Sequence, residues 1–169
     1  MRKIKIIALI GYSGSGKTHF ILEAIQLLKI KRSYNIGVIK NIHEHQIDKE
    51  GKDTYRYTKG GAEFSITKNV YNETTIFLKK KINSEELLEW ISESPLQIDV
   101  VFLEGFRDIN FPTILCVDTF EDIQSQINPH VKMISGKLLL EENEVPYFSN
   151  VPIIDIKKDF QKFLNLFEL

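Results

Sequence analysis

The stretch IKIIALIGYSGSGKT, Ile4 to Thr18, decides the fold of this chain. Its first half, Ile4 to Ile10, is an apolar and largely β-branched run that is typical of a buried strand. Its second half, Gly11 to Thr18, matches the pattern G-x-x-x-x-G-K-[ST] at every position, and a helical pattern over Lys17 to Leu28 follows directly. The sequence therefore predicts a strand, a glycine-rich turn and a helix in direct succession.

The glycine-rich turn has the chemistry of a phosphate-binding loop, here called the P-loop. Its glycines allow backbone conformations that let successive N–H groups surround an anion, and the positive end of the following helix favours negative charge. Lys17 is expected to reach the β and γ phosphates of a nucleotide, and the Thr18 hydroxyl to coordinate Mg²⁺. The predicted nucleotide-binding residues are Gly11, Tyr12, Ser13, Gly14, Ser15, Gly16, Lys17, Thr18 and His19.

A flexible Gly/Ser turn is the simplest alternative to a P-loop. It does not explain why lysine and threonine follow the last glycine. At ordinary residue frequencies, roughly 0.6% of chains of this length would match the pattern by chance, before a preceding strand and a following helix are required. The context of the motif therefore favours nucleotide binding.

The rest of the chain alternates strand patterns with helix patterns, which indicates an α/β fold with a mostly parallel sheet. We predict a three-layer, P-loop NTPase-like fold in which two segments separated by Asn69 and Asn72 form an antiparallel hairpin. No linker or repeat is visible, so residues 1–169 are expected to form a single nucleotide-binding domain. The further predicted strands are Asn35–Lys40, Ala62–Thr67, Thr74–Leu78, Val100–Leu103, Ile114–Val117 and Val131–Ile134, with helices after Asn83 and around Phe160–Phe167.

Composition narrows the class of protein. The chain has 169 residues, of which 43% are hydrophobic, and a single cysteine, Cys116, which excludes an intrachain disulfide framework. No apolar run is long enough for a membrane helix, so we expect a cytoplasmic protein. Residues 1–84 contain 16 Lys and Arg against 7 Asp and Glu, and residues 85–169 contain 6 against 16. This split argues against a uniformly basic nucleic-acid binder and favours a polyanionic ligand on the N-terminal half, with a solvated dipolar surface as the alternative explanation of the lysines.

An acidic residue at the end of a neighbouring strand usually completes a P-loop site. The segment VVFLEGF, Val100 to Phe106, supplies Glu104, which we predict as a Mg²⁺ ligand together with Thr18 and as a candidate catalytic residue. Asp99 precedes the same strand and is therefore expected at its opposite end, roughly 16 Å away, where it would cap or be solvated.

A long polar segment, KNIHEHQIDKEGKDTYRYTKGGA, follows the second predicted strand, in the place where many P-loop proteins have a mobile loop that senses the γ phosphate. Asp53 is a second candidate catalytic residue. Two histidines, at 43 and 45, lack a third ligand for zinc, and we reject a zinc site. Candidate phosphate or partner contacts in this segment and after Glu104 are Lys40, His43, Asp48, Arg56 and Arg107.

Together these residues resemble the molybdopterin-guanine dinucleotide biosynthesis accessory proteins of the MobB type. The first matching block after the P-loop is similar to the family's lysine and histidine segment that leads to D-x-x-G-K-D-S and A-G-A. The second is similar to its strand ending in E-G-F-K, read here as EGFR, with arginine at 107 where the family often has lysine. The first block is read here as Lys40, His43, Asp48, Gly51, Lys52, Asp53, Thr54 and Gly60 to Ala62.

The resemblance implies a GTP-binding, Mg²⁺-using homodimer with weak GTPase activity of its own. It also implies an adaptor role beside the molybdenum cofactor guanylyltransferase, which attaches GMP to molybdopterin. Molybdopterin itself is a further candidate partner that the resemblance suggests. Guanine comes from the resemblance alone, because no N-K-x-D-type signature is present and Ser135-Gly136-Lys137 after a strand is a faint substitute.

Two rival functions use the same P-loop. A small-molecule kinase would need cationic clamps around the transferring phosphoryl group, and no lid-like arginine cluster is visible among Arg2, Arg32, Arg56 and Arg107. An autonomous GTPase switch would need a water activator and a readout surface, and the sequence names neither.

Overall fold

The structure is a computed structural model that describes residues 4–43, 45–140 and 147–169. The chain divides into two compact units, Met1–Asn41 with Ser94–Leu169, and Ile42–Glu93. The single nucleotide-binding domain expected from the sequence stays a prediction.

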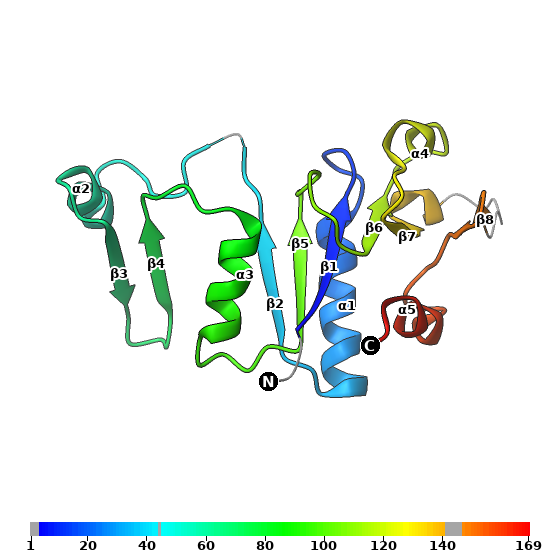
Figure 1. Ribbon diagram of the computed structural model, residues 1–169, viewed down its shortest axis with the longest axis horizontal. Coiled ribbons are helices and arrows are strands. Elements are labelled where there is room, and N and C mark those ends of the chain that lie inside the picture. The colour runs from blue at the N-terminus through cyan, green and yellow to red at the C-terminus, as the bar shows by residue number, and fades with distance from the viewer. Residues whose placement is uncertain (1–3, 44, 141–146) are drawn as a thin grey trace. The chain divides into compact units, whose positions relative to one another are not determined.

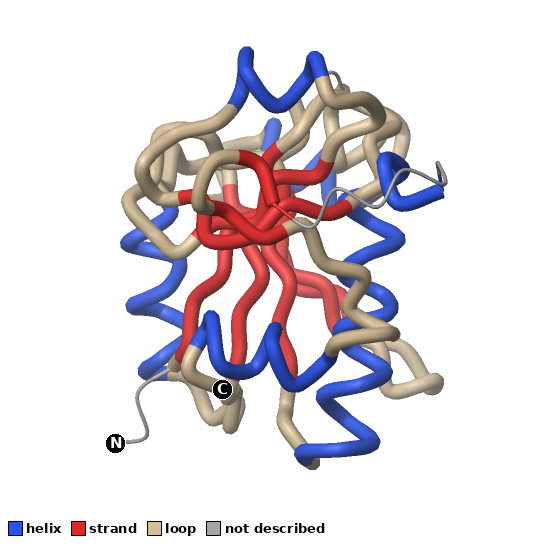
Figure 2. Tube along the Cα trace, turned by 90° about the vertical axis from the view of Figure 1, so that its right-hand side faces the viewer, coloured by secondary structure: helices blue, strands red, loops and turns tan. Residues whose placement is uncertain are grey.

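The first unit is built on a five-stranded parallel sheet in the order β2-β5-β1-β6-β7 (Figure 1). In this order Leu9, near the end of β1, lies opposite Glu104 on one side and Ile114 on the other. The strands form one twisted layer when the view is turned by 90° (Figure 2). The predicted α/β fold with a mostly parallel sheet is confirmed. The strands are β1 (Lys5–Ile10), β2 (Ile36–Lys40), β5 (Val100–Glu104), β6 (Thr113–Cys116) and β7 (Val131–Ser135).

Helix α1 (Lys17–Arg32) begins directly after the P-loop and is one turn longer than the sequence pattern indicates. It ends because Ser33 takes a left-handed conformation, with φ of 55°. The backbone N–H of Ser33 then donates to the carbonyl of Lys29, and that of Tyr34 to the carbonyl of Leu28. This pattern satisfies carbonyl groups that a helix end otherwise leaves open.

Helix α5 (Phe160–Phe167) packs against α1. The side chain of Asp159 accepts the N–H of Lys162 and so caps its first turn. The ring of Phe163 lies edge-on to that of Phe20 in α1, with centroids 6.0 Å apart. The four apolar residues whose spacing predicts one face are buried in the larger core cluster: Phe160, Phe163, Leu164 and Phe167.

Four short elements of the first unit are absent from the sequence-based prediction. Helix α4 (Glu121–Gln126) contributes buried Ile123 to a second apolar cluster on β6 and β7. A 3₁₀ turn (Lys137–Leu140) follows β7, and β8 (Tyr147–Phe148) pairs antiparallel with β9 (Val151–Pro152). Each is too short to carry a clear hydrophobic period.

The second unit contains the predicted antiparallel hairpin, β3 (Phe64–Lys68) with β4 (Thr74–Leu78). Asn69 forms its turn, because its side-chain oxygen accepts the N–H groups of Tyr71 and Glu73. Helix α3 (Ser84–Glu93) follows, and Asn83 caps it by accepting the N–H of Glu86, as predicted.

The polar segment before the hairpin is not a loop throughout, which corrects the sequence prediction. Residues Asp53–Lys59 form helix α2. Thr54 and Thr58 lie one turn apart on its buried side, and the Thr58 hydroxyl donates to the Thr54 carbonyl. The sequence pattern hides this helix because its buried positions are threonines rather than apolar residues.

Candidate nucleotide-binding site

The P-loop lies at the carboxyl end of the central strand β1, where a parallel sheet binds its ligands. Its backbone packs closely against other parts of the chain at two of its glycines. A Cβ on Gly11 would lie 2.1 Å from the carbonyl oxygen of Cys116, and one on Gly16 would lie 3.3 Å from the Cα of Gly136. Both glycines also have φ in the left-handed region, 144° and 98°. Space and conformation both require glycine at position 11, and at position 16 the positive φ favours glycine while the contact is tight.

The turn after β7 packs against the second half of the P-loop. Gly136 has φ of 108°, and a Cβ there would lie 2.5 Å from the Ser15 carbonyl oxygen and 2.6 Å from that of Val117. The backbone N–H of Lys137 donates to the same Ser15 carbonyl at 3.3 Å. This Ser-Gly-Lys turn is only a faint signal in the sequence. The signal that could have found it is a glycine directly after an apolar strand.

Lys17 reaches back over the mouth of the P-loop. Its ammonium donates to the carbonyl oxygens of Gly11 at 2.9 Å and Tyr12 at 2.7 Å. Burial lowers the pKa of Lys17 below its usual range, and the charge of Arg107 adds to this effect while that of Glu104 opposes it. A phosphate oxygen bound in the loop would offer this half-buried ammonium a better acceptor than neutral carbonyl groups.

Glu104 joins the P-loop helix to β2. The Thr18 hydroxyl donates to its Oε1 at 3.0 Å, and the ammonium of Lys40 lies 3.0 Å from the same oxygen. Glu104 is only 5% exposed. A hydroxyl and a carboxylate side by side are oxygen donors of the type that Mg²⁺ prefers, so the residues present fit this ion. At the other end of β5, Asp99 accepts the N–H of Asn35 at 2.8 Å, as expected for a capping residue.

Other predicted P-loop residues differ in exposure. Ser15 is buried, and its hydroxyl has no hydrogen-bond partner among the described residues. Ser13 and Gly14 are exposed. His19 lies beyond the loop, where its Nε2 is 2.7 Å from a carboxylate oxygen of Glu23. The structure thus brings the loop backbone and its hydroxyls together and leaves the imidazole on the outer face of α1.

Tyr12 and Arg107 form the outer rim of the P-loop. Tyr12 is about half exposed, and the guanidinium carbon of Arg107 lies 5.6 Å from the centre of its ring. Arg107 follows β5 through Gly105, whose N–H donates to the carbonyl of Leu9 at 3.0 Å. The candidate contact at 107 therefore lies at the nucleotide site of the first unit.

Four candidate residues belong to the second unit. Asp48 is buried and accepts the Thr54 hydroxyl at 2.7 Å, which stabilises the start of α2. Asp53 and Arg56 are exposed and 3.6 Å apart, and His43 is exposed. Their roles in phosphate contact or catalysis stay predictions.

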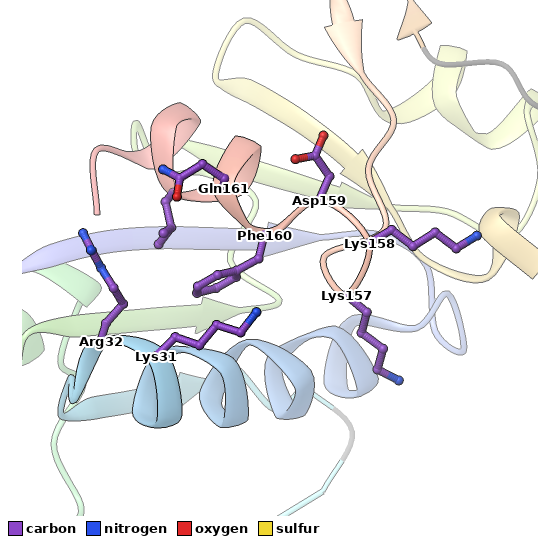
Figure 3. Close-up of a pocket in the computed structure, with 8 residues that line it drawn as sticks. Lys31, Arg32, Lys157, Lys158, Asp159, Phe160 and Gln161 are labelled. Atoms are coloured by element: carbon purple, nitrogen blue, oxygen red, sulfur yellow. The ribbon is translucent and has the colours of Figure 1, made fainter.

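A cavity of about 400 Å³ lies at the opposite end of α1 from the P-loop, between Lys31 and the start of α5 (Figure 3). Phe160 points toward α1 in this view, and Lys31 lies over its ring with the ammonium 5.1 Å from the centre. The cations at its rim already have partners, since Lys157 pairs with Glu23. This cavity is therefore separate from the P-loop.

The described helices include none with the length and apolar character needed to cross a bilayer.

Comparison with known proteins gives a consistent result. The family model described as molybdopterin guanine dinucleotide synthesis protein B matches residues 6–134. A putative molybdopterin-guanine dinucleotide biosynthesis adapter protein of Methanocaldococcus jannaschii is 32% identical over 136 residues, which cover 78% of this chain and 54% of that protein. The adapter protein of Haemophilus influenzae is 34% identical over 119 residues, 67% of this chain and 63% of that protein. The chain thus spans between half and two thirds of the length of these relatives.

Solved structures agree on the fold. The crystal structure of Bacillus subtilis MobB superimposes with a TM-score of 0.76 at 21% identity, covering 97% of this chain and 98% of that one. A MobB homologue from Bacillus stearothermophilus gives 0.67 at 18% identity, covering 98% and 97%. With the family model matching most of the chain, the protein belongs to the molybdopterin guanine dinucleotide synthesis protein B family.

Proposed function

We propose that this chain is a GTP-binding adaptor of molybdenum cofactor biosynthesis, which assists the guanylyltransferase that attaches GMP to molybdopterin. Membership of the family and the names of its relatives support the pathway and the adaptor role. The observation that carries nucleotide binding is the P-loop itself, with Thr18 and Glu104 in contact beside it. We further propose that residues 1–169 act as a single nucleotide-binding domain.

Each part of the P-loop would make a different contact with the bound nucleotide. The backbone amides from Tyr12 to Thr18 would surround the phosphates at the start of α1. The Lys17 ammonium would exchange the carbonyls of Gly11 and Tyr12 for phosphate oxygens. Thr18 and Glu104 would hold Mg²⁺, which supplies charge neutralisation between the β and γ phosphates.

Weak hydrolysis accords with the surroundings of Glu104. Its Oε1 contacts Thr18 and Lys40, and a carboxylate that also holds Mg²⁺ would be poorly available to orient an attacking water. Asp53, which is exposed, is the second catalytic candidate. We therefore expect GTP turnover well below the 1–100 s⁻¹ typical of kinases.

A homodimer is supported by the hairpin of the second unit. Phe64 pairs with Leu78 and Ile66 with Ile76 across the two strands, so all four side chains lie on one face. Their exposed fractions are 55%, 42%, 54% and 40%. An exposed apolar face of this kind favours association, and we propose a second copy of the chain as its partner. The buried single thiol, Cys116, accords with a cytoplasmic location.

Binding and reconstitution test this proposal. Calorimetric titration of the chain with GTP, GDP and ATP, with and without Mg²⁺, should give selective guanine-nucleotide binding that Lys17→Ala abolishes. The chain should then raise the yield of the guanylylated cofactor when added to the guanylyltransferase and molybdopterin, and Lys17→Ala should not. Rapid phosphoryl transfer from a nucleotide to a metabolite would instead identify a small-molecule kinase.

A further inference from the structure

Arg107 is held beside the P-loop from two sides. Its Nη2 donates to the Oε1 of Gln126 in α4 at 3.1 Å, and its guanidinium lies 5.6 Å from the centre of the Tyr12 ring. The glycine before it in the strand exit, Gly105, has φ of 83° and turns the chain toward β1. Backbone and side chain therefore both direct this guanidinium to the rim of the loop.

The groups that hold Arg107 are themselves fixed. Gln126 is only 6% exposed, and its amide nitrogen donates to the carbonyl of Asp122 at 3.3 Å. The hydroxyl of Tyr12 lies 3.3 Å from the hydroxyl of Ser125, the residue before Gln126. Helix α4 thus contacts the first variable residue of the P-loop and the guanidinium that lies over it.

The charge of Arg107 has no carboxylate partner within 4.0 Å among the described residues, and its side chain contacts an amide oxygen and an aromatic ring instead. Two further cations belong to the same site: the Lys17 ammonium lies on the carbonyl oxygens of Gly11 and Tyr12, and that of Lys40 lies 3.0 Å from Glu104. Glu104, the nearby anion, already contacts Thr18 and Lys40. The mouth of the loop therefore holds more positive than negative charge, an arrangement that an additional anion would stabilise.

We propose that Arg107 contacts the terminal phosphate of a bound nucleoside triphosphate and so makes the site prefer triphosphate over diphosphate. This inference rests on the proposed nucleotide-binding function and adds a specificity-determining residue to it. A guanidinium offers two parallel N–H groups to one phosphate, which gives it both charge and direction. The acceptor on Gln126 is a neutral amide oxygen, so moving one N–H to a phosphate oxygen exchanges a weaker acceptor for a stronger one.

The proposal makes α4 sensitive to the terminal phosphate. Arg107 shares Gln126 with this helix, and Tyr12 shares Ser125 with it. A guanidinium that turns toward a phosphate would loosen the first of these contacts and leave the second. The loss of the terminal phosphate would restore the contact between Arg107 and Gln126.

The test compares affinities for GTP and GDP, each with Mg²⁺, in the wild type, Arg107→Ala, Arg107→Lys and Arg32→Ala. Arg32 is an exposed arginine at the far end of α1 and serves as the matched control. Arg107→Ala should weaken GTP binding by about 10-fold or more while GDP binding changes by less than about 3-fold, because a charge-assisted hydrogen bond is lost only with the triphosphate. Arg107→Lys should lie between, and Arg32→Ala should match the wild type.

An unchanged ratio of GTP to GDP affinity in Arg107→Ala would overturn the role of Arg107 and leave nucleotide binding intact. A wild type that binds neither nucleotide would overturn the proposed function, and the role of Arg107 with it. If ATP binds in place of GTP, the same comparison with ATP and ADP decides the role of Arg107, and only the assignment of guanine fails.

Discussion

The hydroxyl of Thr18 and the carboxylate of Glu104 lie 3.0 Å apart, although 86 residues separate them in the sequence. The parallel pairing of β1 with β5 creates this proximity, because it brings the ends of two distant strands to the same edge of the sheet. The proposed Mg²⁺ site therefore depends on the register of the sheet as well as on the P-loop.

Replacing Glu104 by Gln should remove most of the effect of Mg²⁺ on GTP affinity. The amide keeps the shape of the side chain and can still accept the Thr18 hydroxyl, but it lacks the charge that a divalent cation requires. Titrations with and without Mg²⁺ measure the effect, which we expect to fall by about 10-fold. Asp99→Asn, at the other end of β5, is the control. A full Mg²⁺ response in Glu104→Gln would transfer the ligand role to Asp48 or Asp53.

Gly136→Ala should destabilise the protein and weaken nucleotide binding. The new Cβ would meet the Ser15 and Val117 carbonyl oxygens in addition to the strain of positive φ, and overpacking of this kind costs roughly 1 to 3 kcal/mol. Gly61→Ala is a close control, because Gly61 has φ of 107° against 108° but no atom within 4 Å of its Cβ position. Urea denaturation should show the larger loss for Gly136→Ala. Equal losses would mean that strain alone matters at both sites.

GTP affinity should fall in alkaline solution before the ordinary lysine pKa of 10.5 is reached. Burial lowers the pKa of Lys17 in the free protein, so its ammonium loses its proton as the pH rises through that lowered value. A bound triphosphate favours the charged form, so binding weakens over the same interval. Titrations between pH 7 and 10 measure this trend. In Lys17→Arg the side chain stays charged, so the residual GTP affinity should not fall over this pH interval.

The lowered pKa of Lys17 also affects folding stability. Because the folded protein holds the Lys17 proton less tightly than the unfolded chain, this residue opposes folding at neutral pH. That opposition decreases as the pH rises toward 10.5.

The Cys116 thiol should be inert in the native protein. Burial raises its pKa to about 12, and the side chain is fully enclosed, so almost no accessible thiolate exists at neutral pH. Reaction with an aromatic disulfide reagent should be slow in buffer and rapid in strong denaturant. Thr75→Cys adds an exposed thiol on the hairpin and should react at once. Rapid labelling of the native wild type would show that β6 opens readily.

Ile76→Lys should convert the proposed dimer to a monomer, because it places a charge on the apolar hairpin face. The side chain of the neighbouring Thr75 lies on the opposite face of the hairpin, so Thr75→Lys should leave the association unchanged. Sedimentation at several protein concentrations distinguishes the two. If both variants associate as the wild type does, the dimer uses another surface.

The features that sequence predicts well here are those that local chemistry determines. The turn from Gly11 to Thr18 needs its glycines wherever it occurs, and α5 has apolar residues at each buried position from Phe160 to Phe167. Asn69 builds the hairpin turn through its own side chain. Each of these signals lies within one or two turns of the chain, which is the range that periodicity and capping rules cover.

The features that sequence reasoning missed depend on contacts between distant residues. Gly136 reads as an ordinary turn glycine until its closeness to the Ser15 carbonyl is known. Gln126 is polar yet buried, and from helix α4 it accepts a hydrogen bond from Arg107. Helix α2 buries threonines, which no apolar pattern marks. Pairing across the fold, rather than local preference, decides these roles.

The register of the central sheet also sets an order of events during synthesis. Strand β1 leaves the ribosome before both of its neighbours in the sheet, which begin at Val100 and Thr113. The glycine turn cannot acquire its native support until most of the chain has been translated, since Cys116 and Gly136 press against it from later segments. A nascent chain that stalls before β6 would therefore carry the complete nucleotide motif and have no working pocket.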